Sequence, residues 1–111
     1  MTALITRDEL VSEIEAGTVI VLDALGGDYY DRQHLPGALP LLAADVETQA
    51  PQLLPDKDAA IVTYCSDASC PNSQQVATKL ESLGYTNVRK YRDGINDWTG
   101  AGLPVEASAV A

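Results

Sequence analysis

Ala59-Ala-Ile-Val-Thr-Tyr64 is a short apolar stretch, and Cys65-Ser-Asp-Ala-Ser-Cys70 follows it with both cysteines of the chain. The first stretch is rich in β-favouring residues and predicts a buried strand. Pro71 suits the first turn of a helix and Gly84 suits its end. Apolar residues recur between them at helical spacing, at Val76, Leu80 and Leu83. Cys65 is therefore expected on a turn from a strand to a helix.

A cysteine on such a turn has two interpretations. The unpaired N–H groups and the dipole of the following helix stabilise a thiolate, which is the nucleophilic form of cysteine. A thiol with the ordinary pKa of about 8.5 is roughly 3% ionised at pH 7, whereas a pKa of about 6.5 ionises most of it. Cys65 is either such a nucleophile or a small buried residue that ends a strand, and the local sequence leaves both open.

The length and composition predict one domain. The 111 residues, 46% of them hydrophobic, fit a single compact domain over residues 1–111, with residues 105–111 as a frayed tail. No apolar run approaches the roughly 20 residues that span a bilayer. The segment from Met1 to Arg7 lacks a signal-type pattern, so we expect a cytoplasmic location.

The charge and the ligand-type residues exclude several function classes. Seven basic against sixteen acidic residues give a net charge of −9, which disfavours nucleic acid and anionic membranes as partners. An anionic substrate would need local backbone donors, because the far field repels it. Two cysteines and a distant His34 do not make a four-ligand zinc spacing, so no metal and no cofactor are expected.

The remaining elements alternate along the chain. A capping box at Thr6-Arg-Asp-Glu9 and a stop at Gly17 predict a first helix. Further strands are predicted at 18–23, 39–41 and 87–91, and further helices at 26–32, 45–54 and 95–101, with Pro51 expected to break the second of these. Strands that alternate with helices predict an α/β sandwich, a small parallel sheet with helices on both faces.

Several motifs, in order over most of the chain, resemble those of single-domain rhodaneses. They are Val21-Leu-Asp23, His34-Leu-Pro-Gly-Ala38, Leu54-Pro-Asp-Lys-Asp58, Ile61-Val-Thr-Tyr-Cys65, Leu83-Gly-Tyr-Thr-Asn-Val88, the segment from Tyr91 to Trp98, and Ala101-Gly-Leu-Pro104. The resemblance implies a five-stranded parallel sheet and a catalytic cysteine at Cys65 that carries sulfane sulfur as a persulfide. It also implies that Cys65 takes sulfur from a small anion such as thiosulfate and passes it to cyanide, a thiol or a protein acceptor.

The loop after Cys65 is the expected anion cradle. Its main-chain N–H groups would face the persulfide and the departing anion, from Ser66, Asp67, Ala68, Ser69 and Cys70. The hydroxyls of Ser66 and Ser69 either add donors or satisfy the loop itself. We expect the Asp67 carboxylate to point to solvent, because beside the site it would raise the thiol pKa and repel an anion.

The chain departs from the usual family pattern in its basic residues. No Arg or Lys lies between Cys65 and Ser73, and this loop is about two residues longer than is common in the family. Leu25 stands where an Arg usually follows the first-strand Asp. A phosphatase of related fold would need an Arg near Asn72, so phosphatase activity is disfavoured.

Cys70 leaves several interpretations open. It is a resolving thiol that attacks the Cys65 persulfide and releases sulfide, a second sulfur acceptor, or a small residue packed under the loop. The alternative function for the whole chain is a thiol-redox or regulatory module with a reversible Cys65–Cys70 disulfide. Structural roles are expected for His34 in a turn, for Asp23 at a strand end and for Trp98 in the core.

Overall fold

Five parallel strands form one sheet in the computed structural model, which describes residues 2–107. The strands are β1 (Ala3–Leu4), β2 (Ile20–Asp23), β3 (Leu39–Pro40), β4 (Ile61–Tyr64) and β5 (Val88–Tyr91). Their order in the sheet is β1-β5-β4-β2-β3. All four residues of β4 are buried, as expected for a central strand. The predicted α/β class with a five-stranded parallel sheet is confirmed.

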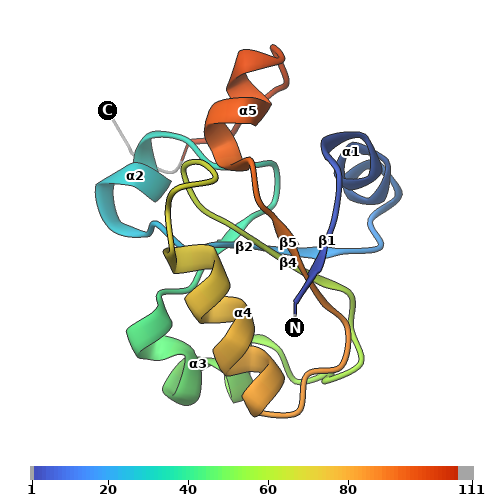
Figure 1. Cartoon of the computed structure of the whole chain (residues 1–111), viewed down its shortest axis with the longest axis vertical. Helices are drawn as coiled ribbons and strands as arrows, with labels where there is room; N and C mark the ends of the chain where they lie inside the picture. Colours follow the sequence, from blue (N-terminus) through green and yellow to red (C-terminus); the bar gives the residue numbers. More distant parts are fainter. Residues whose placement is uncertain (1, 108–111) are drawn as a thin grey trace.

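Helices cover both faces of the sheet (Figure 1). They are α1 (Arg7–Ala16), α2 (Gly27–Arg32), α3 (Val46–Leu53), α4 (Asn72–Ser82) and α5 (Gly94–Gly100), with the 3₁₀ turn η1 (Ala43–Asp45) before α3. Among residues 2–107, none of these helices combines the length and the hydrophobicity required to cross a membrane.

The strands divide the core into two clusters because successive side chains point to opposite faces. Leu22 and Ile61 belong to the cluster formed with α3 and α4. Their neighbours Val21 and Val62 belong to the cluster formed with α1 and α5. The sheet is therefore buried on both sides, which explains why its central strands are continuous apolar runs in the sequence.

The structure differs from the sequence prediction at β1 and at Pro51. The two residues of β1 pair with Arg89 and Lys90, a segment too short to give a periodic signal. The predicted break at Pro51 is wrong, because α3 continues through it. Pro51 lies in the last turn of α3, and the Tyr85 hydroxyl supports this end of the helix by donating to the Leu54 carbonyl oxygen at 2.6 Å.

The segment after Pro104 also differs from the prediction in part. Residues 108–111 lie outside the described residues. Glu106 pairs with His34 through two backbone hydrogen bonds of 2.8 and 2.9 Å. Its carboxylate also accepts the N–H of Gly37 at 2.8 Å. The backbone at Glu106 is thus held by hydrogen bonds to the turn of residues 34–37.

Asp23 ties the end of β2 to the end of β4. Its fully buried carboxylate accepts the N–H groups of Leu25 at 2.7 Å and Gly26 at 3.1 Å, which confirms the predicted turn-fixing role. Its other oxygen accepts the Tyr64 hydroxyl at 2.6 Å, and that hydroxyl accepts the N–H of Leu35. Burial, and next the Asp23 charge, raise the pKa of Tyr64 far above its usual value, so the hydroxyl stays protonated and donates.

Removing this buried donor destabilises the fold. We expect Tyr64→Phe to lower the free energy of unfolding by about 1.5–3 kcal/mol, since it leaves the Asp23 carboxylate and the Leu35 N–H short of a partner. Urea unfolding followed by Trp98 fluorescence measures the change. Tyr29→Phe is the matched control, because Tyr29 is 63% exposed and its hydroxyl has no hydrogen-bond partner among residues 2–107. Equal losses in both variants would contradict the role of the Asp23 network.

Candidate active site

Cys65 follows the last residue of β4, at the carboxyl end of the sheet. Its side chain is buried, with 1% exposed. The loop of residues 65–71 runs from β4 to the start of α4, and Figure 1 shows it next to α2 and α5. The predicted position of Cys65 on a strand-to-helix turn is confirmed.

Cys65 and Cys70 form a disulfide, with their Cα atoms 6.2 Å apart. Cys70 is half-buried, whereas Cys65 is buried. The two sulfur atoms therefore reach each other within one loop. This pairing differs from the interpretation of Cys70 as a thiol that only packs under the loop.

Asp67 organises the loop between the two cysteines. Its carboxylate accepts the hydroxyl of Ser69 at 2.6 Å and the N–H of Ser69 at 3.0 Å, and its carbonyl accepts the N–H of Cys70 at 3.2 Å. The bond from the Ser69 hydroxyl, and then that from its N–H, hold the pKa of Asp67 below its ordinary value. Asp67 thus fixes the loop through Ser69, and its carboxylate remains exposed to solvent, as expected.

These contacts reduce the number of N–H groups that the loop can offer to an anion. The N–H groups of Ser69 and Cys70 bond to Asp67 and are not free for an anion, and the Ser69 hydroxyl satisfies the loop itself. The N–H groups of Ser66, Asp67 and Ala68 make no hydrogen bond to any residue from 2 to 107. In this form of the loop, the first three of the five predicted N–H donors are available.

Helix α5 holds the beginning of the loop, at Cys65 and Ser66. The N–H of Ile95 donates to the carbonyl of Cys65, and the N–H of Asn96 donates to the carbonyl of Ser66, both at 3.0 Å. This approach requires Gly94, whose φ is +70°. A Cβ at Gly94 would lie 2.5 Å from the Cys65 oxygen and 2.6 Å from the Ser66 carbonyl carbon.

The start of α4 is anchored to two strands. The Thr63 hydroxyl of β4 donates to the buried carbonyl of Ser73 at 3.0 Å. The Asn72 side-chain amide donates to the carbonyl of Ala24, after β2, at 3.3 Å. The N-terminal end of this 11-residue helix therefore follows the cysteine loop in a fixed position, and its dipole favours a thiolate there.

A pocket of about 410 Å³ opens beside the loop at Ser66. Its lining comes from α2, the loop and α5, and consists of Leu25, Tyr29, Arg32, Gln33, Ser66, Ile95 and Asn96. The pocket brings Arg32 to the cysteine loop, which has no basic residue of its own. Arg32 was not predicted from the sequence, because its distance from Cys65 along the chain gives no local signal.

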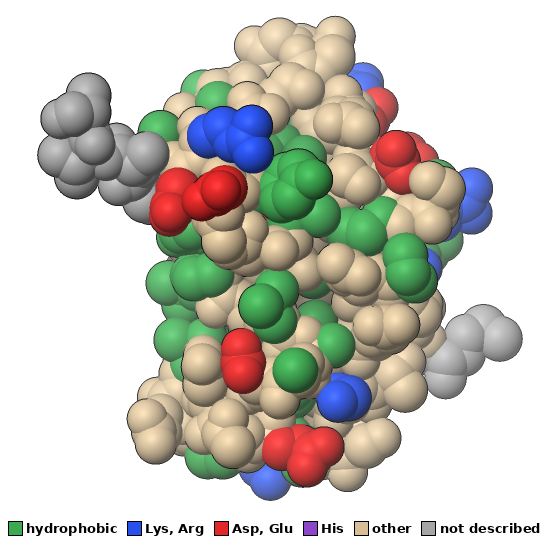
Figure 2. All heavy atoms as spheres, turned by 90° about the vertical axis from the view of Figure 1, so that its left-hand side faces the viewer, with side chains coloured by type: hydrophobic (Ala, Val, Ile, Leu, Met, Phe, Trp, Pro, Cys, Tyr) green, Lys and Arg blue, Asp and Glu red, His purple; other side chains and the backbone are tan. Residues whose placement is uncertain are grey.

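Arg32 has an unpaired charge. Its Nε donates to the Asp28 carbonyl at 3.3 Å, and its guanidinium lies 5.5 Å from the centre of the Tyr29 ring. Within residues 2–107, no carboxylate forms an ion pair with Arg32. Figure 2 shows the side of the molecule at the left of Figure 1, where hydrophobic groups are spread over the surface and a basic side chain near the top lies beside acidic ones. An exposed cation of this kind can attract a small anion into the pocket.

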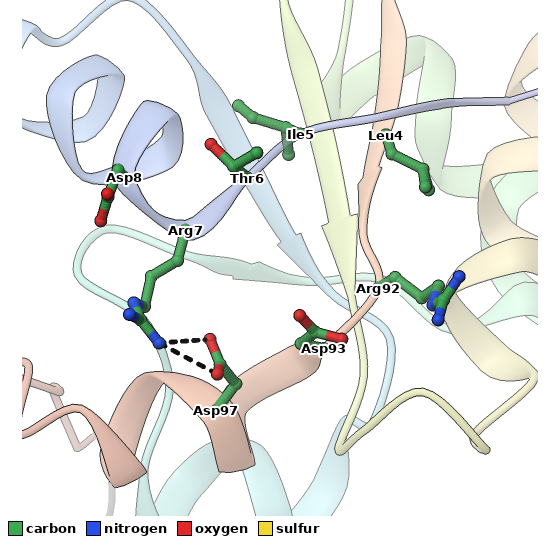
Figure 3. A pocket seen from close by; sticks show the side chains of 8 residues that line it. All are labelled: Leu4, Ile5, Thr6, Arg7, Asp8, Arg92, Asp93 and Asp97. Atoms are coloured by element: carbon green, nitrogen blue, oxygen red, sulfur yellow. Dashed lines mark hydrogen bonds and ion pairs between the residues drawn. The ribbon is translucent and has the colours of Figure 1, made fainter.

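A second hollow of about 420 Å³ lies between α1 and α5 (Figure 3). Its lining contains no residue of the cysteine loop and consists of Leu4, Ile5, Thr6, Arg7, Asp8, Arg92, Asp93 and Asp97. Figure 3 shows Arg7 facing Asp97, whose two oxygens accept Arg7 Nη1 at 3.0 and 3.1 Å. Asp97 also accepts the Tyr91 hydroxyl. The Arg7 charge is thus paired within this hollow, which is separate from the cysteine site.

The other candidate residues have structural contacts. The buried His34 stacks on Tyr30 with 3.9 Å between ring centres, and its Nδ1 donates to the Tyr30 carbonyl. Trp98 packs edge-on against Tyr91, and its Nε1 donates to the Pro104 carbonyl. These contacts agree with the predicted structural roles. Among residues 2–107, no three His, Cys, Asp or Glu side chains gather as metal ligands.

Comparison with known proteins gives a family match. The model of the family described as "Rhodanese-like domain" matches residues 6–101. The chain is 34% identical over 105 residues to the HTH-type transcriptional regulator Rv0324 of Mycobacterium tuberculosis, an alignment that covers 95% of this chain and 45% of the regulator. It is 26% identical to the uncharacterized protein YibN of Escherichia coli, covering 92% of this chain and 71% of that protein. The chain therefore spans less than half of the regulator's length.

Solved structures share the fold. The BH2092 protein from Bacillus halodurans superposes with a TM-score of 0.87 at 25% identity, covering 96% of this chain and 78% of that one. Thiosulfate sulfurtransferase from Pseudomonas aeruginosa superposes with a TM-score of 0.78 at 22% identity, covering 98% of this chain and 21% of that one. At this lower identity, the similarity to the sulfurtransferase from Pseudomonas aeruginosa shows a shared fold only.

The contact between Gly94 and the loop predicts a specific loss of stability. We expect Gly94→Ala to lower the free energy of unfolding by about 3 kcal/mol, because it combines a left-handed backbone with a clash against the Cys65 carbonyl. Gly102→Ala is the matched control, since Gly102 has a φ of +75° and a Cβ added there would have no atom within 4 Å. The control should lose only about 1 kcal/mol in the same urea titration. Equal losses would show that the close approach is unimportant.

Proposed function

The chain belongs to the rhodanese-like domain family, a sulfurtransferase superfamily, and from this we propose that it transfers sulfane sulfur through a persulfide on Cys65. The observation that carries the proposal is the position of Cys65, buried at the carboxyl end of the central strand and followed by a fixed helix N-terminus. The proposed substrates are a small sulfur-containing anion such as thiosulfate and an acceptor such as cyanide or a thiol, including a protein thiol.

The first step of the proposed reaction loads Cys65. With the disulfide reduced, the Cys65 thiolate attacks the outer sulfur of thiosulfate and forms an S–S bond to it. The bond between the two sulfur atoms of thiosulfate breaks, and sulfite leaves with the electron pair. The unpaired N–H groups of Ser66, Asp67 and Ala68 are the donors proposed to hold the terminal sulfur and the leaving anion.

The second step discharges Cys65. The acceptor thiolate or cyanide attacks the outer sulfur of the persulfide, and the Cys65 thiolate leaves. The dipole of α4 stabilises this leaving group, just as it stabilises the nucleophile of the first step. The proposal includes a cytoplasmic location, where the thiol pool would keep both cysteines reduced.

Arg32 supplies the charge that the loop lacks. In the proposed complex its guanidinium attracts the anionic donor into the pocket that Arg32 and Ser66 share. Salt screens the attraction between Arg32 and the anion least at short distances. There the attraction offsets part of the repulsion that arises from the net charge of −9. The arrangement supports an anionic sulfur donor for this chain.

The disulfide favours a second candidate function. A thiol-redox or regulatory module would use the reversible Cys65–Cys70 bond and turn over no sulfur. The similarity to a protein named as a transcriptional regulator is compatible with this function. The two functions differ in the mass change of the Cys70→Ser variant: a carrier gains one sulfur atom from thiosulfate, whereas a redox module gains none.

Loading of Cys65 is tested most directly without Cys70. We expect the reduced Cys70→Ser variant to gain one sulfur atom from thiosulfate, measured by intact-protein mass spectrometry. The Cys65→Ser variant should gain none, because Cys70 lies beyond the end of the strand and lacks the proposed donors. Sulfur gained equally by both variants, or by neither, would contradict the proposal of a Cys65 carrier.

The role of Arg32 is tested by removing its charge. In the Cys70→Ser background, we expect Arg32→Gln to lower kcat/KM for thiosulfate with cyanide as acceptor by roughly three- to tenfold, through KM. Arg92→Gln is the matched control, because Arg92 is an exposed arginine in the other hollow and should leave kcat/KM within about twofold. Raising the salt concentration should shrink the Arg32 effect. Equal effects of the two variants would contradict a local role for Arg32.

A further inference from the structure

We propose that Cys70 resolves the Cys65 persulfide, so that this chain releases sulfide and not only passes sulfur to an acceptor. The inference deepens the proposed function and rests on it. It starts from the two sulfur atoms, which the structure joins across a loop with 6.2 Å between Cα atoms. The bonded pair is the product that such a resolving step leaves.

In addition to the disulfide, hydrogen bonds hold each cysteine in place. The Cys70 N–H bonds to the Asp67 carbonyl at 3.2 Å, and the Asp67 carboxylate fixes the intervening turn through Ser69. The carbonyl of Cys65 accepts the N–H of Ile95 from α5 at 3.0 Å. Because these bonds do not need the S–S bond, we expect Cys70 to stay near Cys65 when both thiols are reduced.

The resolving step balances without an oxidant. The Cys70 thiolate attacks Cys65 Sγ, the inner sulfur of the persulfide, and forms the Cys65–Cys70 bond. The bond from Cys65 Sγ to the outer sulfur breaks, and the outer sulfur keeps the electron pair, takes a proton from solvent and leaves as hydrosulfide. Two electrons pass from the two cysteine sulfurs to the sulfur that leaves, so the persulfide sulfur is reduced to sulfide.

The contact between the two cysteine sulfur atoms favours attack on the inner sulfur of the persulfide. Cys65 Sγ is in bonding contact with Cys70 Sγ, and Cys65 is 1% exposed. Attack on the outer sulfur would instead move the persulfide to Cys70 and leave Cys65 as a free thiolate. The direct contact of the two Sγ atoms therefore points to sulfide release and not to transfer between the cysteines.

A second turnover requires an external reductant of the disulfide, and the class that we propose is a dithiol. One of its thiolates attacks the Cys65–Cys70 disulfide and displaces one cysteine, and its second thiol then displaces the other. Over one cycle, thiosulfate and a dithiol give sulfite, hydrogen sulfide and the oxidised dithiol.

The test follows a single turnover of the reduced protein with thiosulfate and no other thiol. We expect wild type to release one sulfide per chain and to end as the disulfide, two hydrogens lighter by mass. The Cys70→Ser variant should keep its added sulfur for at least about ten times longer, because it lacks the neighbouring thiol. Equal persistence in both proteins, or sulfide release from wild type with both thiols still free, would overturn the proposal.

A second arm does not depend on thiosulfate. Adding sodium sulfide to the oxidised wild-type protein runs the resolving step backwards, and we expect the added sulfur on Cys65 and a free thiol on Cys70, located by fragmentation of the peptide that contains both. Sulfur on Cys70, or no added sulfur, would overturn the proposal. Failure to load from thiosulfate with success in this arm would reject the proposed donor and keep the resolving role of Cys70.

Discussion

The close contact between Gly94 and the Cys65–Ser66 peptide is the constraint on which the site depends. It lets the first N–H groups of α5 reach the carbonyls of Cys65 and Ser66, at 3.0 Å each. Any side chain at Gly94 would occupy the place of those carbonyls. The loop is thereby held from α5 on one side and from β4 through Ser73 on the other, which fixes the backbone around the buried Cys65.

The loop has fewer free N–H donors for an anion, but it holds its two cysteines close together. Asp67 takes the N–H groups of Ser69 and Cys70, so fewer donors face a bound anion, but the same bonds keep Cys70 within reach of Cys65. Arg32, from α2, brings a positive charge to the pocket at Ser66. A loop that holds two cysteines together, beside a cation from another element, supports the proposed sulfur transfer and the proposed resolving role of Cys70.

Much of the fold could be predicted from the sequence, because its signals are local. The capping box at Thr6 and the apolar run before Cys65 each correspond to an element of the structure. The predicted break at Pro51 failed, because Pro51 lies in the last turn of α3 and Tyr85, from a distant segment, supports the helix end. Strand β1 was missed because two residues carry no period and depend on β5 for their hydrogen bonds.

The sequence by itself determined the α/β class, the strand-to-helix turn at Cys65 and the presence of a second cysteine five residues later, since spacing and burial periodicity are properties of neighbouring residues. Only the tertiary structure decided which groups meet at that turn. Arg32 reaches the pocket at Ser66 and Gly94 reaches the loop because parallel strands bring the segments that follow them to one edge of the sheet. Such contacts between distant segments depend on the order of the strands in the sheet, which no local sequence pattern encodes.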